Sequence, residues 1–273
     1  MKQIILRDLT FIQIKYILVF MIDSHAHLQD EKFLNVKQIV QNALNAGVDK
    51  IICASSSLSA SQKAVKIANE YDNVFATIGV HPEEAGEWCN EVKQKIIELS
   101  KDKKVVAIGE VGLDYCYEFC SREQQKKAFI DQIILANDLK LPLVIHTRDA
   151  SGDTMEIIRN NLQYLTNGVV IHCFNMSLEI LKEILGYGFY ISLGGAITFK
   201  NARGLLDIVC AVDVNRLMLE TDSPYMAPEP FRGTVNEPKN VEYVARKIAE
   251  LKMLTVDDVK KITTLNAEKL FKI

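Results

Sequence analysis

Short apolar runs rich in β-branched residues recur along this chain at intervals of roughly 25 to 35 residues, and longer segments with helical periodicity separate them. This alternation is typical of repeated strand–helix units that build a parallel sheet. The runs that we predict as strands are Met21–Ser24, Lys50–Ala54, Val74–Val80, Val105–Glu110, Pro142–His146, Val169–His172, Phe189–Leu193 and Leu217–Glu220. Since eight is the strand number of a (β/α)₈ TIM barrel, this α/β barrel is the predicted fold.

The segments between these runs carry apolar residues at spacings of three and four positions, which is the pattern of an amphipathic helix. The alternative to a barrel is an open doubly wound sheet, which normally binds its ligand beside a glycine-rich phosphate loop. The sequence contains neither a G-x-G-x-x-G nor a Walker motif, so the barrel is favoured. The predicted helices are Asn35–Ala46, Leu58–Tyr71, Glu91–Lys101, Arg122–Leu139, Thr154–Leu165, Ser177–Leu185, Ala202–Val209, Asn240–Leu251 and Thr255–Leu270.

The chain of 273 residues has the length of one barrel and shows no linker, so we predict a single domain over residues 21–273. Residues 1–20 are apolar but are interrupted by Arg7, Asp8 and Lys15. They lack the uncharged length of about 20 residues that a membrane-spanning helix needs, and no small-residue cleavage site follows them. We therefore predict an N-terminal extension of uncertain role and no membrane association.

The charge balance limits the partners that the surface can bind. A net charge of −3 excludes a protein that coats nucleic acid through a broad basic surface, whereas a local basic rim remains compatible with it. The six cysteines lack both the dense spacing of a secreted disulfide scaffold and paired C-x-x-C zinc motifs. We interpret them as reduced thiols of a cytoplasmic protein, and no motif indicates an obligate protein partner.

Histidines and carboxylates are concentrated where the predicted strands end. The strands of a barrel point their carboxyl ends at one mouth, so side chains far apart in the sequence are expected to meet there. His25 and His27 lie two positions apart and therefore on one face of a strand, where they can hold one ion together. The residues at or just after strand ends are His25, His27, His81, Glu110, His146, His172 and Asp222.

The number of these donors indicates a pair of divalent ions at the mouth. Four imidazoles and two carboxylates exceed the ligands of a single tetrahedral Zn²⁺, and Glu110, from a middle strand, is the expected bridge between two ions. Histidine and carboxylate ligands suit Zn²⁺, Mn²⁺, Co²⁺ and, less well, Mg²⁺. His81 either joins the site or only shapes its mouth. The expected groups are His25, His27 and Asp222 around one ion, and His146 and His172 around the other.

A series of short motifs follows in order from Met21 to the C-terminus. They are MIDSHAHL (21–28), GVHPEE (79–84), GEVGLDY (109–115), HTRDA (146–150), HCF (172–174), ITFKNA (197–202), ETDSPY (220–225) and RGTVNEP (232–238). Through them the chain resembles the TatD family of metal-dependent deoxyribonucleases, within the amidohydrolase superfamily. The resemblance implies a TIM barrel, a metal site at its C-terminal face with the six ligands named above, and hydrolysis of ester bonds, commonly the phosphodiesters of DNA.

A metal-dependent hydrolase of this kind needs a group that handles the proton of the attacking water. A divalent ion lowers the pKa of its bound water to about 7. Asp222 is expected to orient this water and to accept its proton, as the resemblance also implies, and Glu110 is the second residue that we place in the catalytic centre.

Cations and aromatic rings near the motifs are candidate substrate contacts. Arg148 and Arg232 can form bidentate hydrogen bonds with a phosphate, and Lys200 is a third candidate cation. Tyr115 and Tyr225 can stack on a base. The expected partner is therefore DNA, as single strands or strand ends.

Two other functions remain open. One is an amidohydrolase that acts on C–N bonds or acyl esters, such as an aminoacyl-tRNA deacylase. Many dinuclear amidohydrolases bridge their ions with a carboxylated lysine, and Glu110 stands where we would look for one, which favours phosphoesters. The least favoured function is a non-catalytic interaction module that only binds metal.

Deletion of residues 1–20 tests the predicted extension. Because the motifs begin at Met21, the shortened chain should remain folded and keep most of its hydrolytic activity. Circular dichroism and activity of both chains check this expectation. Loss of the folded state in the shortened chain would mean that the extension packs as part of the barrel.

Overall fold

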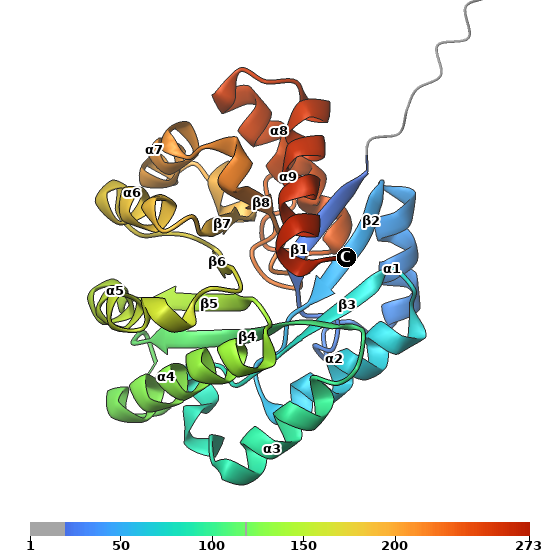
Figure 1. The fold of residues 1–273 in the computed structure, drawn as a ribbon. Helices are drawn as coiled ribbons and strands as arrows, with labels where there is room; N and C mark the ends of the chain where they lie inside the picture. The colour runs from blue at the N-terminus through green and yellow to red at the C-terminus, as the bar shows by residue number, and fades with distance from the viewer. Residues whose placement is uncertain (1–19, 118) are drawn as a thin grey trace, which may run out of the picture.

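The computed structural model describes residues 20–117 and 119–273 and confirms the predicted barrel (Figure 1). Its eight parallel strands follow one another around the sheet in chain order. They match the predicted runs with small shifts at their ends. The extension predicted over residues 1–20 lies outside the described residues, except for Phe20. The strands are β1 (Met21–Ala26), β2 (Val48–Cys53), β3 (Val74–Ile78), β4 (Val105–Asp114), β5 (Leu143–Arg148), β6 (Val169–Ile171), β7 (Tyr190–Leu193) and β8 (Leu217–Leu219).

The described chain has nine α-helices, and all nine were predicted. Figure 1 shows them outside the strands. Their ends follow local capping chemistry: Ser121 forms a capping box with Gln124, and the Thr255 hydroxyl accepts the N–H of Asp258. Within the described residues, no helix is long and apolar enough to cross a bilayer. The helices are α1 (Val36–Asn45), α2 (Leu58–Glu70), α3 (Asn90–Leu99), α4 (Arg122–Leu139), α5 (Ser151–Asn160), α6 (Leu178–Gly186), α7 (Arg203–Ala211), α8 (Val241–Lys252) and α9 (Val256–Phe271).

The barrel closes where the first and last strands meet. The N–H of His27 donates to the Ser223 carbonyl over 2.7 Å, and the N–H of Asp222 donates to the His25 carbonyl over 2.9 Å. These bonds lie at and beyond the carboxyl ends of β1 and β8. The mouth that the strand ends form is therefore held together by backbone bonds between the segments that carry the candidate ligands.

The opposite end of the barrel is filled by apolar side chains. α9 packs across the ends at which the strands begin, where Asn266 donates to the carbonyls of Val214 and Leu217. Because this end is packed, the mouth at the carboxyl ends is the open one, as is usual for barrel enzymes. The buried cluster comprises Ile22, Ile52, Val106, Ala107, Val144, Val170, Tyr190 and Met218 of the strands with Ala267, Leu270 and Phe271 of α9.

Gly112 marks the closest approach of β4 to β5. It pairs with His146 across the sheet, and its φ of +148° is one that side-chain-bearing residues rarely adopt. A Cβ at this position would lie 1.9 Å from the His146 carbonyl oxygen. Glycine therefore lets the strand that carries Glu110 lie directly against the strand that carries His146.

Gly112→Ala should lower the free energy of unfolding by about 1–3 kcal/mol or more, because the added methyl group overlaps the β5 backbone. Gly152→Ala is the matched control, since a Cβ at Gly152 meets nothing within 4 Å. Denaturant unfolding of both variants measures the difference. Equal stability of the two variants would contradict the close approach.

Candidate metal centre

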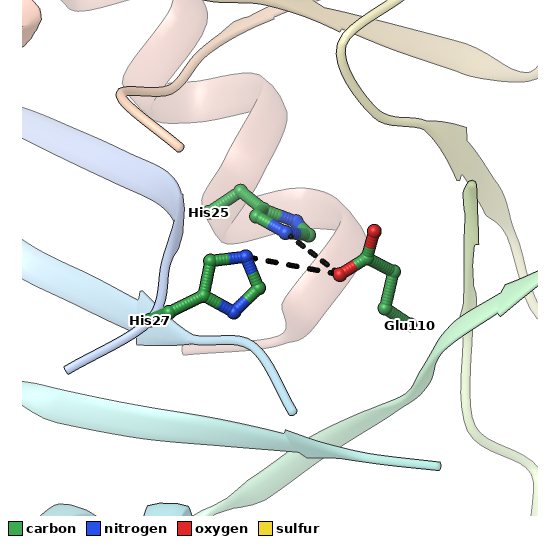
Figure 2. A group of neighbouring side chains, drawn as sticks. All are labelled: His25, His27 and Glu110. Atoms are coloured by element: carbon green, nitrogen blue, oxygen red, sulfur yellow. Dashed lines mark ion pairs between the residues drawn. The ribbon is translucent and has the colours of Figure 1, made fainter. Parts of the chain in front are cut away.

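Glu110, on β4, is buried at the centre of the barrel mouth. One of its carboxylate oxygens, Oε2, lies 3.3 Å from His25 Nε2 and 3.8 Å from His27 Nε2. Figure 2 shows both rings turned toward this one oxygen. His25 belongs to β1, and His27 is the first residue after this strand. The two-residue spacing therefore places both imidazoles on the inner face, as the sequence predicted.

The other oxygen of Glu110 faces a second pair of histidines. Oε1 lies 2.9 Å from His146 Nδ1, on β5, and 2.7 Å from His172 Nε2, directly after β6. The two ring nitrogens are 3.0 Å apart. Donors that lie about 2.1 Å from one ion are separated by roughly 3 Å, so these three atoms are spaced as ligands of a single ion would be. One carboxylate thus faces two separate pairs of imidazoles.

Asp222 lies against the first pair. Its Oδ1 is 3.2 Å from His27 Nε2 and 4.0 Å from His25 Nε2. Asp222 follows β8 with a left-handed φ of 55°, a conformation that aspartate tolerates better than most residues. Burial raises the pKa of Asp222, but the hydrogen bond with His27 and the charges of nearby histidines lower it below its usual value. The side chain is therefore a charged acceptor beside the first histidine pair.

Hydrogen bonds on the outer side of two rings determine which nitrogen is free. His27 Nδ1 lies 3.1 Å from the Ala54 carbonyl oxygen, which can only accept, so a neutral ring keeps its proton there and leaves Nε2 free. His146 Nε2 lies 3.0 Å from Asp114 Oδ2, which leaves Nδ1 free. Metal-bound histidines are commonly oriented by such an outer acceptor. Both free lone pairs face Glu110.

Some buried ring nitrogens of the cluster lack a hydrogen-bond partner. They are both nitrogens of His25 and Nδ1 of His172, and these two rings stack with centroids 4.0 Å apart. A buried polar atom without a partner is costly, and His25 Nε2 faces the Glu110 carboxylate. A divalent cation would satisfy this nitrogen. The donor set therefore fits the metal ions that the sequence predicts.

The charges of the cluster control its ionisation. Burial raises the pKa of Glu110, but the surrounding histidines hold it well below its usual range. Burial lowers the pKa of His27 and of His146, but hydrogen bonds with Asp222 and Asp114, respectively, together with Glu110, raise both values to about 9. Metal binding at this cluster must therefore displace protons, since only a neutral imidazole can be a ligand.

His81, which follows β3, also joins the cluster. Its Nε2 lies 3.6 Å from Glu110 Oε1, and its Nδ1 accepts the N–H of Glu83 over 3.2 Å. Burial and the neighbouring His146 lower the pKa of His81 to about 3. The ring is therefore neutral and carries its proton on Nε2, so it presents a hydrogen-bond donor rather than a lone pair to the mouth.

The cluster opens into a cavity of about 640 Å³ at the barrel mouth. Arg148, a predicted substrate contact at the end of β5, lines this cavity. Lys63 of α2 adds a second cation, and Tyr117 and Tyr225 add two partly exposed rings. Lys63 did not stand out in the sequence, because a lysine on an amphipathic helix resembles any solvated one. Its place at the mouth depends on how α2 packs.

Three further predicted substrate contacts, Tyr115, Arg232 and Lys200, are not among the described residues that line this cavity. Tyr115 donates its hydroxyl to Asp153 over 2.7 Å and borders a neighbouring cavity. The Arg232 guanidinium lies 4.3 Å from the centre of the Phe199 ring, and the adjacent Lys200 is exposed. The structure thus brings Arg148 to the metal centre and leaves the other three residues around it.

Two carboxylates support the cluster from behind. Glu220 accepts the N–H of Cys173 over 2.7 Å and lies 3.9 Å from His172 Nδ1, and burial raises its pKa to about 7. The sequence pattern did not single out Asp114. The even spacing of Glu110 and Asp114 was the available signal, because side chains at even spacings share one face of a strand.

Comparison with known proteins agrees with this geometry. The family model described as TatD related DNase matches residues 22–272. The chain is 40% identical over 252 residues to the metal-dependent hydrolase YabD of Bacillus subtilis, and the match covers 92% of this chain and 98% of the relative. It is 32% identical over 260 residues to the 3'-5' ssDNA/RNA exonuclease TatD of Escherichia coli, with 93% and 99% covered.

A solved structure shows the same fold. The chain superposes on the TatD homologue YjjV of Escherichia coli with a TM-score of 0.88 and 27% identity, and the match covers 94% of this chain and 99% of that one. The chain therefore belongs to the family of TatD-related DNases and is a metal-dependent hydrolase.

Proposed function

We propose that this hydrolase cleaves phosphodiester bonds of DNA at a pair of divalent metal ions. The observation that carries the proposal is Glu110, whose two oxygens face separate pairs of histidines. When bound, two ions supply a water of lowered pKa and stabilise the attacking and leaving oxygens of a phosphodiester. The name of the Escherichia coli relative, an exonuclease, supports this substrate class. The proposed ligands are His25, His27, Glu110, His146, His172 and Asp222.

Asp222 is the proposed proton acceptor. Its carboxylate borders the cavity, is held in the charged form and contacts the first histidine pair, so it can orient the attacking water and take its proton. Glu110 lies among the imidazoles at the base of the cavity, with a side chain that is only 5% exposed. Its role is therefore to hold the two histidine pairs at a fixed separation rather than to exchange protons with solvent.

Donors on the cavity wall are placed to bind a phosphate. Arg148 offers a planar guanidinium for bidentate hydrogen bonds, Lys63 a second positive charge and His81 a neutral N–H. These groups come from three different βα units. The closed barrel brings these three donors to one cavity beside the candidate metal ligands.

The rings at the rim favour an unpaired strand. Tyr117 is 45% exposed and Tyr225 is 44% exposed, and a cation lies over each ring: Arg148 at 5.0 Å from the centre of Tyr117, and Lys32 at 4.0 Å from that of Tyr225. Exposed rings next to cations bind unstacked bases and the phosphates between them. We therefore propose single strands or strand ends as the substrate.

The alternative activities are separated by one experiment. Single-stranded DNA, duplex DNA, RNA and an aminoacylated tRNA are each incubated with the enzyme and Mg²⁺, Mn²⁺, Zn²⁺ or Co²⁺. We expect the fastest turnover on single-stranded DNA. Exclusive release of the amino acid would instead identify a deacylase, and binding without turnover would identify an interaction module.

We also propose a cellular location and domain limits for the enzyme. All six cysteines are free thiols, which supports a reducing, cytoplasmic location. We further propose that residues 21–273 form a single hydrolase domain, because the eight strands and the described site residues all lie within them.

Asp222→Asn isolates the proposed proton acceptor, because the amide keeps the size and one oxygen but loses the charge. Turnover of single-stranded DNA should fall by about 10² to 10⁴-fold or more, while metal content changes little. Single-turnover rates and metal analysis on the same samples measure both quantities.

His25→Ala is the control for that experiment, since it removes a proposed ligand and should lose both metal and activity. Circular dichroism establishes that both variants are folded. A folded, metal-replete Asp222→Asn variant with the wild-type rate would refute the assigned role.

Arg148→Ala should weaken transition-state binding of DNA by roughly 1.5–3 kcal/mol, which is the range for a charge-assisted hydrogen bond. Arg159→Ala is the matched control, because Arg159 pairs with Glu183 on the outer helices. The ratio kcat/KM, measured at several salt concentrations, is the readout. If the two variants behave alike, Arg148 does not contact the substrate.

A further inference from the structure

A second, mainly apolar groove of about 440 Å³ lies beside the metal centre. Its walls come from the segment after β6, the segment between β7 and α7, and α7 itself. Met226, four residues after Asp222, lines both this groove and the metal cavity. The groove and the metal cavity are therefore neighbours that share this side chain as part of their walls. Its lining residues include Met176, Leu178, Phe199, Leu205, Ile208 and Met226.

The chemistry of the groove differs from that of the metal cavity. Asp207 is the one charged side chain among the described lining residues, so the floor does not suit a phosphate. Asn175 and Asn201 offer amides that can donate and accept hydrogen bonds along the edge of a planar ligand. A flat apolar body with a polar edge is the shape and polarity of a nucleobase.

Cations lie at the edge of the groove rather than inside it. The Arg232 guanidinium stands over Phe199, a lining residue, and Lys200 follows next in the chain. This places positive charge where the sugar–phosphate backbone would pass if a base occupied the groove. Arg232 and Lys200, which do not line the metal cavity, would then have a role beside this groove.

We propose that this groove binds a nucleobase of the substrate strand next to the phosphodiester that is cleaved, with Arg232 and Lys200 contacting the adjoining phosphate. The inference rests on the proposed nuclease function and adds a base-binding subsite to it. The base packs against Phe199 and Met226, and the two asparagine amides contact its edge.

Gly204, at the start of α7, allows the groove to be filled without strain. It lines the groove, and a Cβ built on it meets nothing within 4 Å. Gly204→Phe should raise KM for a single-stranded oligonucleotide by about 10-fold, since stacking of one base is worth that order of affinity. Gly186→Phe is the matched control, because Gly186 also faces open space but does not line the groove.

A phosphodiester without an aromatic group separates this proposal from the nuclease assignment. An oligomer of stable abasic sugar phosphates carries no base, so Gly204→Phe should hydrolyse it at the wild-type rate. If the wild-type enzyme hydrolyses neither this ester nor the oligonucleotide, the nuclease function fails. If Gly204→Phe and Gly186→Phe have the same KM for DNA while both remain active, the base-binding subsite is refuted.

A binding measurement on an otherwise intact groove gives an independent test. The Asp222→Asn variant is used so that cleavage does not interfere. Its affinity is measured for a fluorescent single strand and for strands that each carry one stable abasic position. Loss of a single base near the 3' or 5' end should weaken binding by about 10-fold. The same loss should have no effect when Gly204→Leu already fills the groove. Equal affinity for all strands would overturn the proposal even if the phenylalanine variant failed to fold.

Discussion

The buried carboxylate of Glu110 is the constraint on which the rest of the site depends. A charged carboxylate inside a protein is costly by several kcal/mol unless opposite charges and donors surround it. Here imidazoles from β1, β5 and from the ends of other strands surround it, at distances of 2.7 to 3.8 Å. Each of these strands must be in place before the charge is compensated. The charge of Glu110 is therefore compensated only in the folded barrel.

The two ends of the barrel have different roles: one end stabilises the fold, and the other carries the residues of the candidate metal centre. At one end, α9 and the first residues of the strands exclude water through apolar packing. At the other end, the strand ends carry histidines and carboxylates whose pKa values are strongly shifted. The dense packing below the mouth keeps the candidate ligands in fixed positions, which binding of a divalent ion through short, directional bonds requires.

Contacts outside the ligand set determine what each ligand can do. The Ala54 carbonyl and Asp114 orient the rings of His27 and His146, so each free lone pair faces the carboxylate. In His81 the backbone N–H of Glu83 donates to Nδ1, so the ring carries its proton on Nε2 and presents a donor to the mouth. Similar residues at neighbouring strand ends thus acquire different chemistry from their hydrogen-bond partners alone.

The sequence by itself determined the barrel and the ligand candidates, because strand periodicity is local and the histidines recur at strand ends. It could not place the substrate contacts relative to the metal centre. Arg148 and Arg232 were both candidate cations, yet Arg148 lines the metal cavity and Arg232 stacks on Phe199. The sequence did not identify Lys63 as a substrate contact, because its position at the mouth depends on the packing of α2. Only the tertiary structure decided these roles, since they depend on which loops meet across the mouth, and that is a property of the closed barrel.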